Sequence, residues 1–276
     1  MGIPSYFSYI IKNYSNIICN CKQIEQDQIC FQYLYMDCNS IIYDEFHKME
    51  EDIAKNIIEV EDIEKILISK VISKIGNYIS FVKPSKLVFI AFDGVAPFAK
   101  MEQQRSRRCK GYINEKIKNH TSKNNATAKW STSNITPGTN FMNNLSRKIK
   151  KSFENLEHHY HVTSIIVSGS DEPGEGEHKM FQHIRDTKKS KSDNIAVYGL
   201  DSDLIMLSVF HCKLFEKLFI FRETPEFGKQ LISGDHNDSK YLFLHIQIFA
   251  NAILTEMNTF FYVSYWEMTF YLISLH

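Results

Sequence analysis

The chain has 276 residues, of which 43% are hydrophobic and 23% charged, and these values exclude a wholly disordered protein. Its 32 basic residues balance its 32 acidic residues, so the net charge by itself indicates neither a nucleic-acid-binding nor a membrane-binding protein. The charges are unevenly placed, however: residues 44–64 carry nine acids against two Lys, whereas residues 100–151 carry 13 Lys/Arg against two Glu. The second block is either a phosphate-binding surface or a solvated helix face.

The first residues, MGIPSYFSYIIKNYSNIIC, do not match a signal peptide, because Lys12 and Asn13 interrupt the apolar run and no small-residue cleavage site follows. The six cysteines include no CxxC pair, which argues against a zinc site and favours free thiols in a reducing compartment. No apolar run is long enough to predict a membrane span. We therefore expect no membrane partner and a cytoplasmic location (the host cytoplasm if the source is a virus), with the nucleus as the alternative.

Four short apolar runs, FQYLYMD, KLVFIAFD, TSIIVSGSDEPGEGEH and NIAVYGLDSD, each lead into acidic residues. Runs of four to eight β-branched and aromatic residues between turn formers are typical of buried strands. The acids that follow them are, in chain order, Asp37, Asp93, Glu175 with Glu177, and Asp201 with Asp203.

Helical patterns separate these runs. Residues 52–78 repeat Ile, Leu and Val at helical spacing, and residues 141–156 form a second such stretch. Strands that alternate with helices predict an α/β fold with a central, mostly parallel sheet flanked by helices. Because ligands bind outside the carboxyl ends of the strands in such sheets, we expect the acids to gather at one edge. A single acid after a strand is usually the N-cap of the next helix, but N-capping alone hardly explains acids after all four strands.

Clustered carboxylates without neighbouring His or Cys ligands favour hard cations, so the sequence predicts Mg²⁺ or Mn²⁺. Two such ions about 3.5–4 Å apart are the usual device for phosphodiester cleavage. We expect two ions, with the six acids as both metal ligands and catalytic residues. Asp201 and Asp203 point to the same side in an extended chain. Glu175 and Glu177 differ in setting, since the Pro173–Gly174 turn keeps the first in the loop, and one of the two could act through water.

The segment AKMEQQRSRRCK follows Asp93 and carries a second group of candidate residues. In a helix, its polar side chains fall near one face: Lys100, Gln104, Arg107 and Arg108. Arg supplies fork-shaped donors for phosphate oxygens, so this face predicts an anion pocket. The basic helix alone is a weak indication, but a neighbouring metal site for phosphodiester cleavage makes the phosphate interpretation specific.

Two segments mark the expected organisation of the chain. Residues 119–134 are polar and predict a surface loop or insertion. We expect a nuclease-type domain over residues 1–221, followed by a divergent, aromatic-rich and helical segment over residues 222–276.

Several long motifs resemble the XRN family of 5′→3′ exoribonucleases. MGIPSYF, MDCNSIIYD, AFDGVAPFAKMEQQRSRR, NITPGTNFM, SGSDEPGEGEHK and YGLDSDLIMLS occur in the order of the family and cover roughly residues 1–210. The resemblance implies a nuclease core like that of PIN and flap-endonuclease domains, and Mg²⁺-dependent removal of nucleotides from single-stranded RNA with a 5′-monophosphate, as in mRNA decay. It also implies that the six acids bind the metal and that the polar face of the helix binds the 5′-phosphate.

The chain departs from the family pattern at specific places. Ser40 stands where the family usually has Gly, and Tyr43 stands where it usually has a base-stacking His, so Tyr43 is the stacking candidate. The later GNDFLP motif, with a further acid, and the second conserved region do not occur. Two alternatives therefore stay open: a catalytically weak protein that binds RNA ends, and a flap-endonuclease-like DNA nuclease. A separate chain could supply the second region, and the sequence does not define the oligomeric state.

Overall fold

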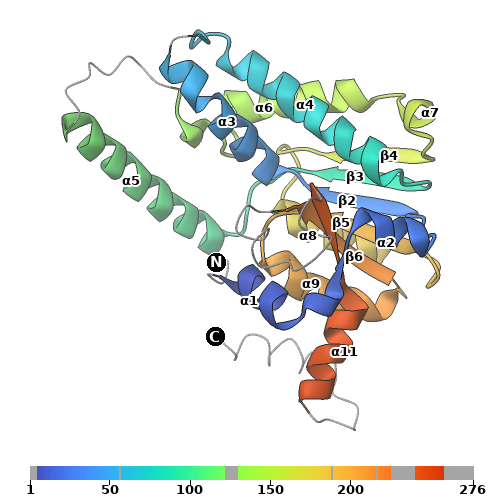
Figure 1. Ribbon diagram of the computed structural model, residues 1–276. Coiled ribbons are helices and arrows are strands. Elements are labelled where there is room, and N and C mark those ends of the chain that lie inside the picture. Colours follow the sequence, from blue (N-terminus) through green and yellow to red (C-terminus); the bar gives the residue numbers. More distant parts are fainter. Residues whose placement is uncertain are drawn as a thin grey trace.

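The structure, a computed structural model, describes residues 5–55, 57–121, 130–187, 189–215, 217–224 and 240–257. Its centre is a seven-stranded sheet in the order β1-β7-β6-β5-β2-β3-β4. The strands are β1 (Ile18–Cys19), β2 (Tyr33–Asp37), β3 (Leu87–Ala91), β4 (Ser164–Ser168), β5 (Asn194–Tyr198), β6 (Lys217–Glu223) and β7 (Tyr241–His245). The sheet confirms the predicted α/β class (Figure 1).

Five strands, from β6 to β4, run parallel, and only β7 and β1 are antiparallel to their neighbours. The chain builds outward from β2 in two directions: β3 and β4 lie on one side, and β5 and β6 lie on the other. The strand order therefore reverses between β2 and β5. A crevice at such a reversal, outside the carboxyl ends of the strands, is the expected place for a ligand in this class of sheet.

Alternate residues of β2, β3, β5, β6 and β7 enter two separate hydrophobic cores. In β2, Tyr35 belongs to one core and Met36 to the other, and both are fully buried. Each aliphatic side chain buried in this way contributes about 1.5–3 kcal/mol relative to full exposure. The near-continuous burial of β2, β3, β5 and β6 explains why these parallel strands read as uninterrupted apolar runs rather than as alternating ones.

The helices form two layers, one on each face of the sheet (Figure 1). One layer contains α3 (Asn39–Ala54), α4 (Ile63–Val82) and α6 (Asn140–Phe153). The other contains α1 (Tyr6–Asn13), α8 (Gly176–Asp186), α9 (Asp203–His211) and α11 (Ile246–Glu256). The remaining α-helices are α2 (Cys21–Gln26), α5 (Phe98–Thr121) and α7 (Glu157–Tyr160), and the short 3₁₀ turns are η1 (Ser15–Ile17), η2 (Thr132–Asn134) and η3 (Cys212–Leu214).

The four predicted strands are confirmed, but the helix expected at residues 52–78 is wrong in its first part. Helix α3 ends at Ala54, and α4 begins at Ile63. Ile57 and Val60, which the pattern assigns to the buried face, are 68% and 48% exposed. The acids just before Ile63 lie at the N-terminus of α4, where negative charge is favourable, so the new helix starts there.

The structure also differs from the expectations for residues 119–134 and 222–276. Helix α5 extends through the first part of the basic block to Thr121, so it takes in the first residues of the predicted 119–134 loop, and residues 122–129 lie outside the described part. After residue 221 the chain completes β6, and β7 then joins the same sheet and leads into α11, so the described part of residues 222–276 is not all helical. Within the described ranges, the structure contains no helix of sufficient length and apolarity to cross a bilayer.

Candidate active site

All six predicted acids lie at the carboxyl edge of the parallel strands. Asp37 is the last residue of β2, Asp93 follows β3, and Asp201 lies in the turn after β5. Glu175 is the N-cap residue of α8, Glu177 lies in the first turn of that helix, and Asp203 begins α9. The six acids line a single open pocket of about 630 Å³.

Gly176 brings the acids of three segments together. Its N–H donates to Oδ1 of Asp93 at 2.7 Å, and a Cβ at this position would stand only 2.7 Å from Oδ1 of Asp37. Any larger residue would therefore require either the Asp37 carboxylate or α8 to shift. The glycine of the GEGEH motif is needed for this close approach.

Asn39 supports the acidic pocket from the first turn of α3, and the sequence reasoning did not identify it. Its Oδ1 accepts the backbone N–H of Asp93 at 3.1 Å. The neighbouring backbone N–H of Cys38 donates to the carbonyl of Ala91 at 2.9 Å. These bonds join the ends of β2 and β3, which carry Asp37 and Asp93, and Asn39 also lines the pocket. Its place two residues after Asp37 is the only signal in the sequence.

The carboxyl groups of the pocket destabilise one another's charged forms. Burial raises the pKa of Asp37, and the nearby charges of Asp93 and Glu177 raise it further. Burial likewise raises the pKa of Glu177 to about 7, with Glu175 and Asp203 adding to the effect. A cation bound among these groups would relieve the repulsion.

The chemistry of these donors suits Mg²⁺ or Mn²⁺, because all six side chains offer carboxylate oxygens. Among the described residues, however, no three His, Cys, Asp or Glu side chains stand in an arrangement that would hold an ion as they are placed. One of the carboxylates, Glu175, pairs instead with Lys100, whose Nζ lies 2.8 Å from Oε2. The carboxylate oxygens fit the predicted ions, and the six acidic side chains would have to move closer to one another to bind them.

Helix α5 forms the opposite wall of the pocket. Lys100, Gln104 and Arg108 all line it, and Arg108 donates to Oε1 of Gln104 at 3.2 Å. The spacing of four residues between them places the three side chains on one side of the helix, as predicted. The side chain of Arg107, the fourth predicted phosphate ligand, lies outside the described part of the structure.

Tyr43, on the second turn of α3, lies between the two walls. It lines the pocket, its side chain is partly exposed, and burial raises its pKa, with further effects from the charges of Asp93 and Arg108. The ring is thus accessible to a ligand next to both an acid and a base. This is the setting expected of a side chain that stacks on a nucleobase.

Other residues that line the pocket were not predicted from the sequence. Tyr112 lies one turn after Arg108, and a further wall comes from the segment that contains NITPG. That segment contributes Ser131, Thr132, Ser133, Ile135, Thr136 and Pro137. Its hydroxyl groups carry no pattern of their own, so only the fold places them here.

The model of the family described as XRN 5′-3′ exonuclease N-terminus matches residues 1–224. The chain belongs to the XRN family. The acids at the strand ends and the α5 wall all fall inside the matched residues.

Three curated XRN relatives are each named 5′-3′ exoribonuclease 1. The Saccharomyces cerevisiae protein is 35% identical over 244 residues, which cover 83% of this chain and 15% of that protein. The Schizosaccharomyces pombe protein is 34% identical over 272 residues, 93% of this chain and 20% of that protein. The Homo sapiens protein is 35% identical over 228 residues, 76% of this chain and 12% of that protein. The chain therefore spans a fifth or less of the length of these XRN relatives.

Proposed function

We propose that this chain carries the active site of a 5′→3′ exoribonuclease that hydrolyses RNA with a 5′-monophosphate and releases nucleotides. The observation that carries the proposal is the shared pocket, in which strand-end acids face a polar helix wall. The Lys100–Glu175 pair spans the two sides at 2.8 Å, so a phosphate on the wall and a metal on the acids would lie close together. Membership of the XRN family and the names of the relatives support the same reaction.

Each side of the pocket has its own part in this mechanism. Lys100, Gln104, Arg107 and Arg108 bind the terminal phosphate through charged and neutral N–H donors, and Tyr43 stacks on the first base. The acids Asp37, Asp93, Glu175, Glu177, Asp201 and Asp203 would hold two Mg²⁺ or Mn²⁺ ions, which supply activated water and charge stabilisation for phosphodiester cleavage. The phosphate wall fixes the 5′ end, so the bond presented to the acids is the first one in the strand.

A degradation assay tests this proposal directly. One RNA sequence is prepared with a 5′-monophosphate, a 5′-triphosphate or a 5′-hydroxyl and incubated with the protein in Mg²⁺ or in chelator. We expect loss of the monophosphorylated RNA alone, only in Mg²⁺, with mononucleotides as the product. Equal cleavage of all three ends, or cleavage in chelator, would contradict the proposal. A branched DNA flap in the same assay tests for the DNA nuclease alternative.

A second candidate is an RNA-end-binding protein without strong catalysis. The observation that favours it is that, in the described residues, no three ligands are placed to hold an ion, while Lys100 engages one of the carboxylates. Salt-sensitive binding of monophosphorylated RNA with no cleavage of any substrate would decide for this candidate, or for an enzyme that needs a second chain.

A further inference from the structure

Lys179 occupies an unusual position beneath the acidic pocket. It lies in the first turn of α8, two residues after Glu177, and is half-buried. Its Nζ donates to the carbonyl of Phe92 at 2.9 Å and to the carbonyl of Gly169 at 2.7 Å. Among the described residues, no carboxylate lies within ion-pair distance of this ammonium group. Burial lowers its pKa, and the charges of Glu172 and Asp93 offset part of that effect.

The two carbonyls belong to the place where β3 and β4 separate. The last backbone bond between these strands runs from the N–H of Phe92 to the carbonyl of Ser168 at 2.9 Å. Beyond it the chains diverge, and carbonyl groups that leave a ladder need new donors. Lys179 supplies those donors from a third element, because an ammonium group carries three N–H bonds.

Both chains that Lys179 joins lead directly to acids of the pocket. Asp93 follows Phe92, and the loop that begins at Gly169 ends at Glu175. The same loop is fitted against the residues after β3, since Gly94 donates to the carbonyl of Gly174 at 2.8 Å and a Cβ on Gly94 would overlap the carbonyl oxygen of Glu172. A shift at Lys179 would therefore change the separation between Asp93 and Glu175.

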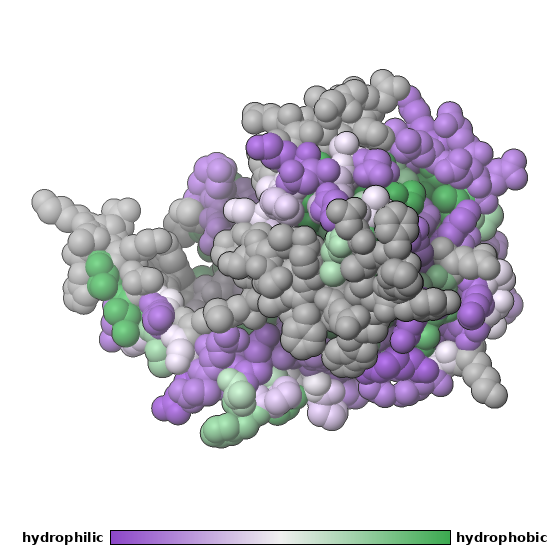
Figure 2. Space-filling model, turned by 90° about the horizontal axis from the view of Figure 1, so that it is seen from below, coloured by the Kyte–Doolittle hydropathy of each residue, from purple (hydrophilic) through white to green (hydrophobic). Residues whose placement is uncertain are grey.

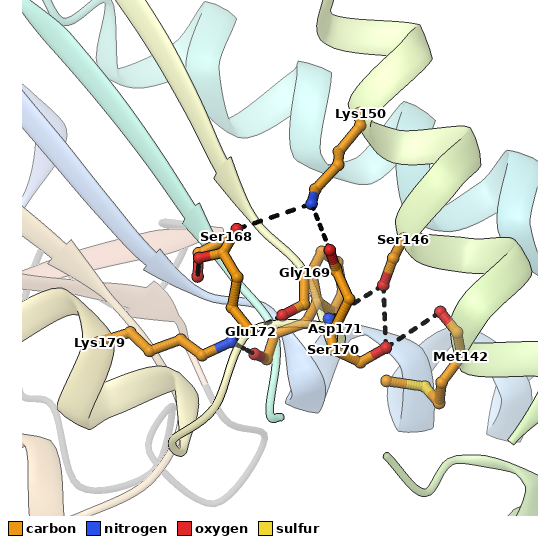
Figure 3. Close-up of polar contacts among 10 residues, drawn as sticks. Met142, Ser146, Lys150, Ser168, Gly169, Ser170, Asp171, Glu172 and Lys179 are labelled. Atoms are coloured by element: carbon orange, nitrogen blue, oxygen red, sulfur yellow. Dashed lines mark hydrogen bonds and ion pairs between the residues drawn. The ribbon is translucent and has the colours of Figure 1, made fainter. Parts of the chain in front are cut away.

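Lys150 offers a natural comparison, because it holds the same loop from the other side (Figure 3). It extends from α6 and pairs with Oδ2 of Asp171 at 2.8 Å and with Oε1 of Glu172 at 3.6 Å. Ser146 and Ser170, whose hydroxyl groups lie 3.0 Å apart, strengthen this outer attachment. Neither Asp171 nor Glu172 lines the pocket.

We propose that Lys179 is a positioning residue that sets the spacing between the Asp93 and Glu175–Glu177 sides of the pocket, whereas Lys150 only anchors the loop to α6. The proposal rests on the proposed function, since it takes these acids as metal ligands. It assigns Lys179 no contact with RNA, because the ammonium group is committed to the carbonyls of Phe92 and Gly169. Its loss should therefore affect metal binding and turnover more than the affinity for RNA.

The test compares Lys179→Met, Lys179→Arg and Lys150→Met in three measurements. These are Mn²⁺ affinity of the protein without RNA, affinity for monophosphorylated RNA in chelator, and kcat and KM in Mg²⁺. Loss of an outer residue that orients metal ligands typically costs about 10–100-fold in metal affinity, and we expect a loss in this range for Lys179→Met. We expect Lys179→Arg to retain more affinity, because it keeps the charge and the donors, and Lys150→Met to match the wild type.

Several outcomes would overturn the inference. Equal Mn²⁺ affinity in Lys179→Met and the wild type would remove the positioning role, and equal losses in Lys179→Met and Lys150→Met would reduce both lysines to loop anchors. If Lys179→Met does not fold, Lys179→Arg becomes the deciding variant. A folded Lys179→Arg protein whose Mn²⁺ affinity falls about as far as that expected for Lys179→Met would contradict the positioning role of Lys179. A wild type that binds Mn²⁺ but degrades no RNA would overturn the proposed function and leave this inference standing. A wild type that binds no Mn²⁺ would overturn both.

Discussion

The two sides of the pocket differ in how the fold supports them. The acidic side rests on the central sheet, and its acids follow β2, β3 and β5 directly or begin α8 and α9. The basic side is one face of α5, which projects away from the body (Figure 1). Ile113 and Ile117, which lie toward the outer end of this helix, are 54% and 56% exposed. Figure 2 shows hydrophobic atoms, in green, on the part of the molecule that projects at the left.

This difference separates two physical tasks. Charged groups that repel one another must be held in place by many bonds, and the acidic side has them in Asn39, Gly176 and Lys179. A side that binds a phosphate needs only donors at the right spacing, which a single helix provides. We therefore expect loss of an acid to affect catalysis, loss of a supporting bond on the acidic side to affect folding as well, and changes on α5 to affect substrate choice.

The largest effect is expected from Asp203→Ala on the acidic side. Asp203 begins α9 and lines the pocket, so its loss should remove a metal ligand while the helix remains. We expect a fall in kcat of at least about 1,000-fold, which corresponds to roughly 4 kcal/mol of transition-state stabilisation. The measurement is degradation of monophosphorylated RNA, with circular dichroism to establish folding. A folded variant of normal activity would remove Asp203 from the site.

A smaller and more selective effect is expected from Arg108→Ala on α5. A hydrogen bond to a charged group contributes about 1.5–3 kcal/mol, so activity on monophosphorylated RNA should fall about 10- to 150-fold. Activity on hydroxyl-ended RNA should change little. Arg105→Ala is the matched control, because this exposed arginine lies on the same helix outside the pocket lining and, among the described residues, pairs only with Glu102 at 3.9 Å. Equal losses on both RNAs would argue against a phosphate pocket.

The smallest effect concerns the stability of the metal-free protein. Burial raises the pKa of Glu177 from 4.5 to about 7, so the folded protein holds a proton that the unfolded chain has lost. The protonation of Glu177 stabilises the folded protein fully below the unfolded pKa of 4.5, and this stabilisation is lost as the pH rises through about 7. In chelator, we expect the melting temperature to fall by a few degrees across this range.

Two comparisons check this assignment. Glu177→Gln should flatten the pH dependence in chelator, whereas Glu102→Gln, a change on the exposed face of α5, should leave it as in the wild type. Mg²⁺ should raise the melting temperature more above about pH 7 than below it, since a carboxyl group must lose its proton to bind a cation. A wild-type profile that Glu177→Gln leaves unchanged would assign the titration to another group.

Much of the acidic side was predictable because its information is local. A buried parallel strand is a short apolar run, and the residue after it must lie at the carboxyl edge of the sheet, so Asp37 and Asp93 could be placed from the sequence alone. The same reasoning placed Lys100, Gln104 and Arg108 on one face, because helical spacing fixes it. The roles of these residues in catalysis stay predictions.

The parts that could not be predicted depend on contacts between distant segments. Asn39 and Lys179 bond to backbone groups near the ends of other strands, and no residue pattern announces a backbone partner. Strand β1 has two residues, too few for a pattern, and β7 lies in an apolar stretch that periodicity does not distinguish from a helix. The break between α3 and α4 was missed because Ile57 and Val60 imitate a buried face while lying exposed.

The pairing of β1 with β7 has a consequence for how the chain is synthesised. Ile18 lies opposite Leu244, and Tyr14 packs edge-on against Phe249 with ring centroids 5.0 Å apart, so the first elements find these partners only when residues 241–256 have emerged from the ribosome. The parallel strands and their acids are made before that point. The apolar side chains of Tyr14 and Ile18 therefore lack these partners while the parallel strands are translated, and such exposed surface is where a nascent chain depends on chaperones.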